Sequence, residues 1–301
     1  EQFDINERPK VSQIQNMFNL LGTLIYWSYT YLVLTQVFTQ ISDNPNVLPF
    51  SFAYPICLFG TLTFVLFSLN AILMPIEPRV EIKSNLKEIL KISLKNKNFL
   101  AVSLMIGLSS IAWVIIITQM LPFLELVLNL NPNDYFLILG INFFCVIAFL
   151  EIWRRVIQKF GKKRTVLYIY VIAALVLPIA LLGLIPLNNF LIIGLLYMIG
   201  ISASLAGWYL FPPIIFADLA EYDNRITGEL KAGTYAGVPS IFLNIFQALG
   251  IFFLGALNEL PKITVGSLSY SMGLIIWSPI CSLILLISWW YTKKHLTLDY
   301  D

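Results

Sequence analysis

Long stretches without a formal charge alternate along the chain with short segments in which charged residues crowd together. The charge-free stretches are 11–42, 44–76, 98–124, 135–150, 165–217, 232–258 and 263–292. About 20 apolar residues cross the hydrocarbon core of a bilayer as a helix. The fifth stretch is long enough for two crossings, with a turn at 186–189. The pattern therefore predicts eight spans, centred near residues 27, 63, 111, 144, 176, 203, 245 and 281. Strands are not expected, because the stretches are long and lack period-two alternation.

Composition supports a membrane protein. The chain is 58% hydrophobic and 12% charged, with a mean hydropathy of +0.80, whereas a soluble domain carries about 25% charged residues. The net charge of +2 is too small to indicate a nucleic-acid partner. Cys57, Cys145 and Cys281 each lie inside an apolar stretch and are expected to be small buried hydrophobes. Because the chain begins with Glu1 and has no signal-peptide pattern, we expect a fragment.

Basic residues are unevenly divided between the two predicted membrane faces. When alternate connections are assigned to one face, 18 of the 19 lysines and arginines fall there, and Lys262 alone falls on the other. Basic loops stay in the cytoplasm, so both chain ends are predicted to be cytoplasmic in a multi-pass protein of the plasma membrane. Trp153, Trp289 and Trp290 lie at span ends and are expected at the membrane interface.

Two connections have patterns of their own. In the longest, 77–98, lysines recur every four residues with apolar residues between them. This pattern predicts a short amphipathic helix at the interface, the alternative being a solvated linker that its lysines hold inside. The connection would also suit a join between two helix bundles. In the basic loop 153–164, Gly161 is expected to permit a tight turn.

Two segments carry a resemblance to a known family. Residues 3–22, FDINERPKVSQIQNMFNLLG, resemble the stretch before the fifth span of the glycoside-pentoside-hexuronide:cation symporters. These symporters are the melibiose-permease-like branch of the major facilitator superfamily. Residues 217–244, ADLAEYDNRITGELKAGTYAGVPSIFLN, are similar to the signature between the tenth and eleventh spans of that family. The second match is the more specific, because many spaced positions agree within one loop.

The resemblance covers the whole chain and implies an all-α polytopic membrane protein of the major facilitator fold. Eight of twelve transmembrane helices, spans five to twelve, would be present. Residues 1–76 would hold the last two spans of an N-terminal bundle whose first four are missing, 77–98 the cytoplasmic inter-bundle loop, and 99–301 the C-terminal six-helix bundle. A coupling ion, Na+ or H+, would bind mainly in the missing part, and no other cofactor is expected. The complete protein is expected to be a monomer.

Polar side chains recur at helical spacing inside the predicted spans, where contact with lipid would be costly. We therefore predict that they line a solute pathway. The predicted substrate-binding residues are Asn19, Thr23, Trp27, Trp208, Tyr209, Ser240, Asn244 and Gln247. Further candidates are Ser109, Ser110, Thr118, Gln119 and Asn142. Asn244 stands where the family usually has a lysine, and asparagine supplies no charge to balance acidic ligands. The alternative is that small polar residues hold the helices together.

Charges crowd between residues 218 and 231. We predict that Asp218, Glu221, Asp223 and Arg225 form a cytoplasmic gate that pairs in one state and separates in another. Asp218 is expected to end the sixth span, where the helix dipole disfavours a negative charge and a basic neighbour is needed. Glu221 and Arg225 are four residues apart and suited to pairing. The alternatives are a solvated loop and a catalytic metal site.

The sequence thus predicts a secondary active transporter that moves a sugar or sugar-like solute through a lipid bilayer by alternating access, with or without a coupling cation. A lipid or lysolipid transporter of the same fold remains an alternative. A membrane-embedded enzyme and a non-transporting scaffold are weaker ones. The lone His295 lies after the last span and no catalytic constellation is visible, so we do not expect an enzyme.

Overall fold

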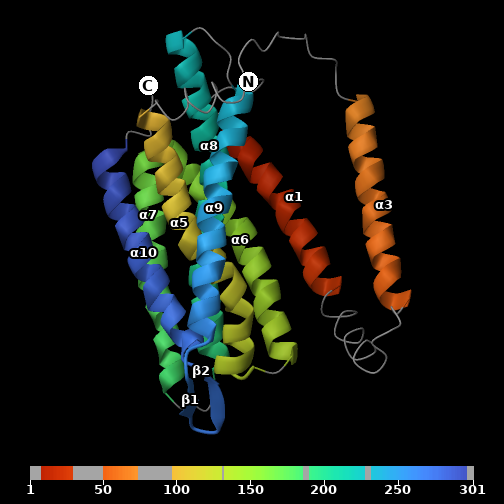
Figure 1. The fold of residues 1–301 in the computed structure, drawn as a ribbon, viewed down its shortest axis with the longest axis vertical. Coiled ribbons are helices and arrows are strands. Elements are labelled where there is room, and N and C mark those ends of the chain that lie inside the picture. Colours follow the sequence, from red (N-terminus) through yellow and green to blue (C-terminus); the bar gives the residue numbers. More distant parts are fainter. Residues whose placement is uncertain are drawn as a thin grey trace. The chain divides into compact units, whose positions relative to one another are not determined.

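A computed structural model describes residues 8–29, 50–73, 97–130, 132–185, 190–227 and 232–296, most of them helical (Figure 1). The long helices are α1 (Arg8–Tyr29), α3 (Phe50–Leu73), α5 (Lys97–Pro122), α6 (Pro132–Phe160), α7 (Lys162–Val176), α8 (Leu191–Thr227), α9 (Ala232–Asn258) and α10 (Gly273–His295). A π-helix, η2 (Phe123–Val127), continues α5, and a 3₁₀ helix, η3 (Leu177–Leu184), continues α7. Strands β1 (Lys262–Val265) and β2 (Leu268–Ser271) form an antiparallel hairpin.

The predicted helical membrane architecture is confirmed. Within the described residues, seven helices are long and apolar enough to cross a membrane. They are Ala53–Leu73, Lys97–Val127, Leu137–Phe160, Lys162–Leu184, Leu191–Tyr222, Gly237–Asn258 and Gly273–His295. They match seven of the predicted spans, including the two expected in 165–217. Helix α1 covers the start of the remaining span and is more polar.

The chain divides into two compact units. One unit contains residues 1–17 and 86–301, and the other contains residues 18–85. In the first, α5 packs against α9 and α10, α6 packs against α8, and α7 packs against α8 and α10. The second holds the rest of α1 together with α3, whose apolar side chains are largely exposed. The predicted division of the chain at 77–98 stays a prediction, because residues 74–96, and with them the expected amphipathic helix, lie outside the described residues.

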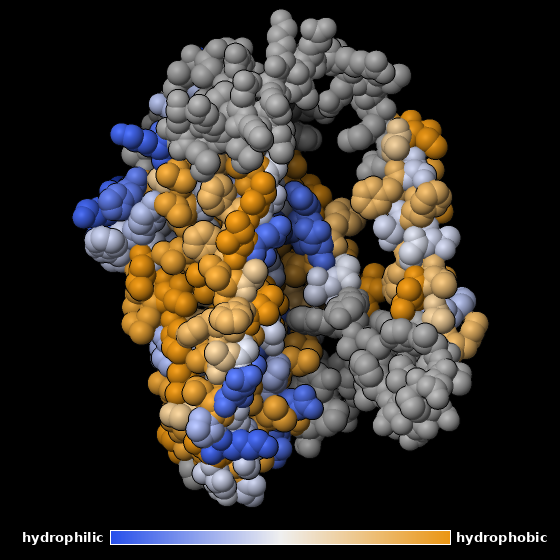
Figure 2. Space-filling view, viewed as in Figure 1, coloured by the Kyte–Doolittle hydropathy of each residue, from blue (hydrophilic) through white to orange (hydrophobic). Residues whose placement is uncertain are grey.

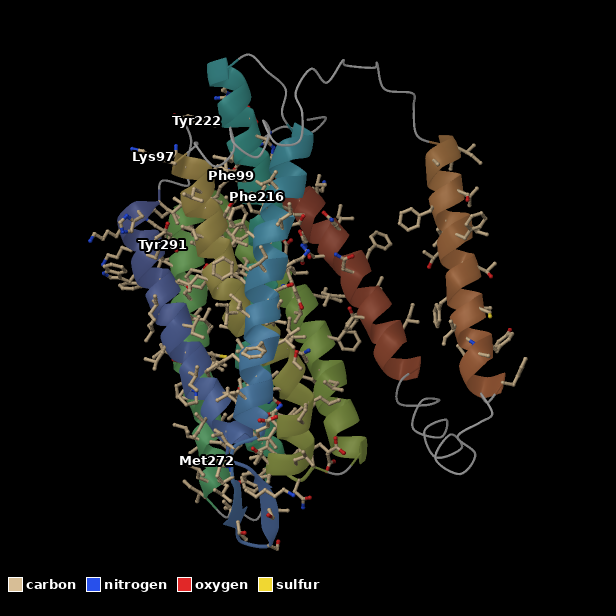
Figure 3. All side chains as sticks on the ribbon, viewed as in Figure 1. Lys97, Phe99, Phe216, Tyr222, Met272 and Tyr291 are labelled. Carbon is tan, nitrogen blue, oxygen red and sulfur yellow. The ribbon has the colours of Figure 1, made fainter. Side chains whose placement is uncertain are left out.

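Helix direction alternates in the first unit. Lys97 at the start of α5, Tyr222 near the end of α8 and Tyr291 near the end of α10 lie toward one end of the bundle, and Met272 lies toward the other (Figure 3). Hydrophobic side chains dominate the middle of the visible face (Figure 2). The helix ends beside three of the connections predicted to share one membrane face, 77–98, 217–233 and the carboxyl tail, therefore lie at the same end of the bundle.

Close helix contacts depend on small residues. A Cβ on Gly250 of α9 would lie 3.1 Å from the carbonyl oxygen of Ile111 in α5. A Cβ on Gly273, at the start of α10, would lie only 1.9 Å from the carbonyl oxygen of Leu257. Without a lipid-side hydrophobic drive between helices, such close approach supplies the packing energy.

Two expectations about the ends of elements were wrong. Helix α8 continues to Thr227, so Asp218 lies inside a helix and not at its end. The charged residues beyond residue 217 extend the helix past its apolar part, and hydropathy alone does not reveal this. The hairpin at 262–271 was also missed. Ile263 and Val265 alternate with polar residues, and Gly266, with φ 62°, occupies the first turn position, as in a type II′ turn.

The cysteine prediction holds only in part, and the tryptophans predicted at the membrane interface differ in burial. Trp153 is 6% exposed and donates its ring N–H to the carbonyl oxygen of Ala203 at 2.6 Å, so its ring packs inside the bundle. Trp290, by contrast, is exposed. Cys281 is buried as expected, whereas Cys145 is half-buried and Cys57 is exposed on α3. The sequence position of these residues shows how far along a helix each one lies, but it does not show whether the side chain faces the bundle interior or its surface.

Candidate functional site

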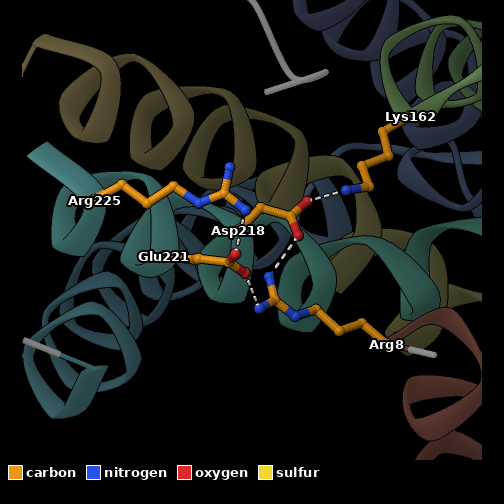
Figure 4. A network of polar contacts seen from close by, with 5 residues as sticks. All are labelled: Arg8, Lys162, Asp218, Glu221 and Arg225. Carbon is orange, nitrogen blue, oxygen red and sulfur yellow. Dashed lines mark hydrogen bonds and ion pairs between the residues drawn. The ribbon is translucent and has the colours of Figure 1, made fainter. Parts of the chain in front are cut away.

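Five charged side chains from three helices form one network, which we call the charged network: Arg8 of α1, Lys162 of α7, and Asp218, Glu221 and Arg225 of α8 (Figure 4). Arg8 donates to Asp218 at 2.8 Å and also to Glu221. Lys162 donates to the second oxygen of Asp218. Arg225 donates to the second oxygen of Glu221 at 2.6 Å. Each oxygen of both carboxylates therefore accepts from a cation.

Burial decreases across the charged network. The side chain of Asp218 is 5% exposed, those of its partners Arg8 and Lys162 are 13% and 15% exposed, and that of Arg225 is 56% exposed. Charge-assisted hydrogen bonds are stronger when they are shielded from water. Asp218 is thus the centre of the network, and Arg225 belongs to its solvated edge.

Local sequence explains how two of the three helices present their charges. Asp218, Glu221 and Arg225 are separated by three and four residues, which places them on one face of α8. Gly161 has φ 80°, a conformation that favours glycine, and it separates α6 from α7. The predicted tight turn is confirmed, and it places Lys162 at the first position of α7.

The contacts of α1 with α8 continue beyond the charges. Arg8, Ser12 and Asn16 follow one another every four residues and so share one face of α1. The Ser12 hydroxyl donates to the carbonyl oxygen of Leu210 at 3.2 Å. The Asn16 amide donates to the carbonyl oxygen of Tyr209 at 2.9 Å. We call this line of polar contacts the α1–α8 seam.

On a neighbouring face of α1, Gln13 donates to Glu151 of α6 at 3.2 Å. Arg154 and Arg155, on the same helix α6, also donate to Glu151. The first turns of α1 therefore make polar contacts with both α6 and α8.

The charged network and the α1–α8 seam were only partly predictable. The Glu221–Arg225 pair is confirmed, and Asp218 has the basic neighbours that it was expected to need. Arg8 and Lys162 were not identified as those neighbours. The helical spacing of Asn19 and Thr23, continued toward the N-terminus in steps of three and four, would have found Asn16 and Ser12. The side chain of Asp223 lies outside the described part of the chain.

The polar residues predicted on α9 share a solvent-accessible side of that helix. Ser240 and Asn244 are exposed and Gln247 is half-buried. Ser240 donates to the carbonyl oxygen of Gly237, one turn earlier in α9. The amide of Asn244 is thus left on the surface of an apolar helix.

The other predicted substrate-binding residues lie in different surroundings. Trp208 is 7% exposed and stacks on Trp113 of α5, with ring centroids 5.7 Å apart, so one face of its ring is covered. Tyr209 is half-buried. Asn19 and Thr23 are exposed in the other unit, and the side chain of Trp27 lies outside the described residues.

The further polar candidates mostly connect helices or bond to their own backbone. Ser202 of α8 donates to Asn142 of α6 at 2.6 Å. Gln119 of α5 donates to Asn258 of α9 at 2.5 Å. Ser109, Ser110 and Thr118 each donate to a carbonyl oxygen three or four residues earlier in α5. These contacts fit residues that hold helices together.

Comparison with known proteins adds a family. A family model described as MFS/sugar transport protein matches residues 3–264. The match spans most of the chain, including every residue of the charged network and of the α1–α8 seam. No curated protein matches the chain.

Proposed function

Because the chain belongs to the MFS/sugar transport protein family of the major facilitator superfamily, and is thus a multi-pass membrane transporter, we propose that it moves a sugar or sugar-like solute by alternating access. Within that superfamily, we assign it to the melibiose-permease-like branch. The two quoted segments, 3–22 and 217–244, support this assignment, and they contain four of the five residues of the charged network.

The observation that carries the proposal is the contact of Arg8 with Asp218 and Glu221. In a transporter of two helix bundles, α1 belongs to the N-terminal bundle and α8 to the C-terminal one. The charged network then joins the two bundles at the cytoplasmic end. Rocking of the bundles that opens this end must pull Arg8 away from both carboxylates.

The energetics of buried ion pairs suit such a lock. The Coulomb attraction of a buried pair is largely offset by the cost of removing both charges from water. The intact network can therefore open at modest cost, because water replaces the lost partners. Loss of one partner is different, since it leaves a buried charge uncompensated in the closed state. The network would thus hold the cytoplasmic end closed without making closure irreversible.

The solute would meet the polar side of α9. Asn244 and Ser240 are exposed on a helix that is mostly apolar, and polar groups in contact with lipid are costly. We propose that this side faces the solute pathway and binds hydroxyl groups through hydrogen bonds. Asn244 supplies no fixed charge there, so coupling to Na+ or H+ would depend on acidic residues elsewhere in the complete transporter.

Uptake of labelled sugars into vesicles that contain the full-length protein, with and without a sodium gradient, tests the proposal. Asp218→Lys should abolish uptake, because it places a third cation beside Arg8 and Lys162. Arg8→Glu in the same protein should restore part of it by reversing the central pair. Arg225→Gln, at the exposed edge, is the matched control and should transport normally. Unchanged uptake by Asp218→Lys would reject the lock.

A further inference from the structure

Helix α8 contains two consecutive prolines, Pro212 and Pro213, in its interior. Proline has no peptide N–H, so the carbonyl four residues earlier in the helix loses its usual donor. Pro213 removes the donor for Tyr209, and Pro212 removes the donor for Trp208. An unsatisfied carbonyl inside a membrane is costly, and helices with internal prolines commonly bend there.

Asn16 of α1 replaces one of these two missing donors. Its amide nitrogen donates to the Tyr209 carbonyl oxygen at 2.9 Å and to the Ser12 carbonyl oxygen at 2.8 Å. Both partners only accept hydrogen bonds, so both must be served by the NH₂ group, which has two hydrogens. Asn16 is 7% exposed, so little water can compete.

The contact requires a particular kind of side chain. A serine or threonine hydroxyl has one hydrogen and could not serve both carbonyls, and an aspartate carboxylate has none. The adjacent Ser12 contact is different in kind. Its acceptor is the carbonyl oxygen of Leu210, whose usual helical donor is the N–H of Ile214, four residues later. Ile214 has this N–H, so the Ser12 hydroxyl is an additional donor and does not replace a missing one.

We propose that Asn16 is a positioning residue that replaces the missing N–H of Pro213 and thereby fixes the backbone of α8 at Tyr209, where the internal proline favours a bend. When α1 separates from α8, the Tyr209 carbonyl loses this donor and α8 is free to bend there. Trp208 and Tyr209, two predicted solute-binding residues, lie at this point of α8. Opening of the charged network would therefore be linked to a change in the solute site, a link that rests on the proposed function.

A double-mutant cycle in thermal unfolding of the purified, detergent-solubilised protein tests the contact without any transport. Asn16→Ala should lower the Tm by about 2–4 °C, the shift expected when one buried carbonyl loses its donor. Pro213→Ala restores the peptide N–H, so Asn16→Ala should cost much less in that background. An equal Tm loss in both backgrounds would overturn the proposal.

Pro212→Ala is the matched control. It restores a donor to the Trp208 carbonyl and not to that of Tyr209, so the cost of Asn16→Ala should stay unchanged beside it. Asn16→Asp keeps the proline and the size of the side chain but removes the donor, and it should lower the Tm at least as much as Asn16→Ala. This second variant decides the question if Pro213→Ala does not fold, and an unchanged Tm for Asn16→Asp would reject the contact.

Transport then tests the link to the solute site. Asn16→Ala should change kcat, through the rate of opening, more than it changes KM, and Pro213→Ala should bring kcat back toward the wild-type value. If the unfolding cycle shows coupling while kcat does not move, the contact stands and the link fails. Absence of any sugar uptake by the wild-type protein would count against the proposed function and leave the unfolding result intact.

Discussion

Asp218→Asn removes the central charge of the network while keeping the size of the side chain. At the 2.8 Å separation of the Arg8–Asp218 pair, the Coulomb attraction is about 6 kcal/mol at an effective dielectric constant of about 20, before desolvation is subtracted. Breaking a buried pair by removing one partner typically costs about 3–5 kcal/mol. Arg8 keeps Glu221 as a partner, which lowers the expected cost to about 2–3 kcal/mol.

This cost applies to the closed state only, since the separated charges are hydrated in the open state. A shift of about 2–3 kcal/mol changes the ratio of open to closed protein by about 30- to 150-fold. Ser12, which is 3% exposed beside the network, offers a reporter position. With Cys57, Cys145 and Cys281 replaced, Ser12→Cys should react with a membrane-impermeant maleimide in inside-out vesicles at a rate set by the open fraction.

Asp218→Asn should raise the labelling rate of this cysteine tens of fold, up to the rate of a fully exposed thiol. Arg225→Gln removes an exposed pair worth only about 0.3–0.5 kcal/mol, so it should change the rate about two-fold or less. Equal labelling rates for Asp218→Asn, Arg225→Gln and the parent protein would show that the charged network does not hold this end closed.

Three further predictions concern packing, the hairpin and the solute site. Gly273→Ala should lower the free energy of unfolding, measured by chemical denaturation, by about 3 kcal/mol, because its Cβ would lie 1.9 Å from the Leu257 carbonyl oxygen. Gly237→Ala is the control and should not destabilise the protein, because a Cβ there would have no neighbouring atom within 4 Å. Tyr270→Phe should cost about 1–2 kcal/mol through the lost hydrogen bond to η3. Burial raises the pKa of Tyr270 above that of an unfolded tyrosine. The contribution of Tyr270 to the free energy of unfolding should therefore be complete below about pH 10 and decline above it, and Tyr270→Phe should lack this decline. Asn244→Ala should raise the KM for the transported sugar about 5- to 10-fold, and an unchanged KM would remove Asn244 from the solute site.

The membrane-spanning helices could be predicted because the absence of charge over about 20 residues is itself the physical requirement for crossing a bilayer. The prediction failed at the ends of the charge-free stretches, where this requirement no longer applies. Helix α8 extends to Thr227, and its charged end forms one i,i+4 pair and further pairs with other helices, which the length of a charge-free stretch does not predict. The hairpin at 262–271 is nearly free of charge and so resembled the start of a span, although its alternation and Gly266 indicate strands.

The site was predictable where its contacts are local. Glu221 and Arg225 are one helical turn apart, so their spacing alone predicts the pair. The partners of Asp218 come from residues 210 and 56 positions away, Arg8 and Lys162, and only the packing of three helices brings them together. Asn16 was missed for a related reason, since a proline marks a missing donor but does not indicate which helix replaces it.

We propose that α1 and the six helices α5 to α10 separate at the charged network during transport. Lys10 on α1 and Lys97 at the start of α5 are exposed and lie outside the network, so spin labels at these positions report the separation directly by pulsed electron–electron distance measurement. We expect one short distance in the wild-type protein and a second, longer population in Asp218→Asn that also grows when solute is added to the wild type. A single distance, unchanged by the substitution and by the solute, would contradict it.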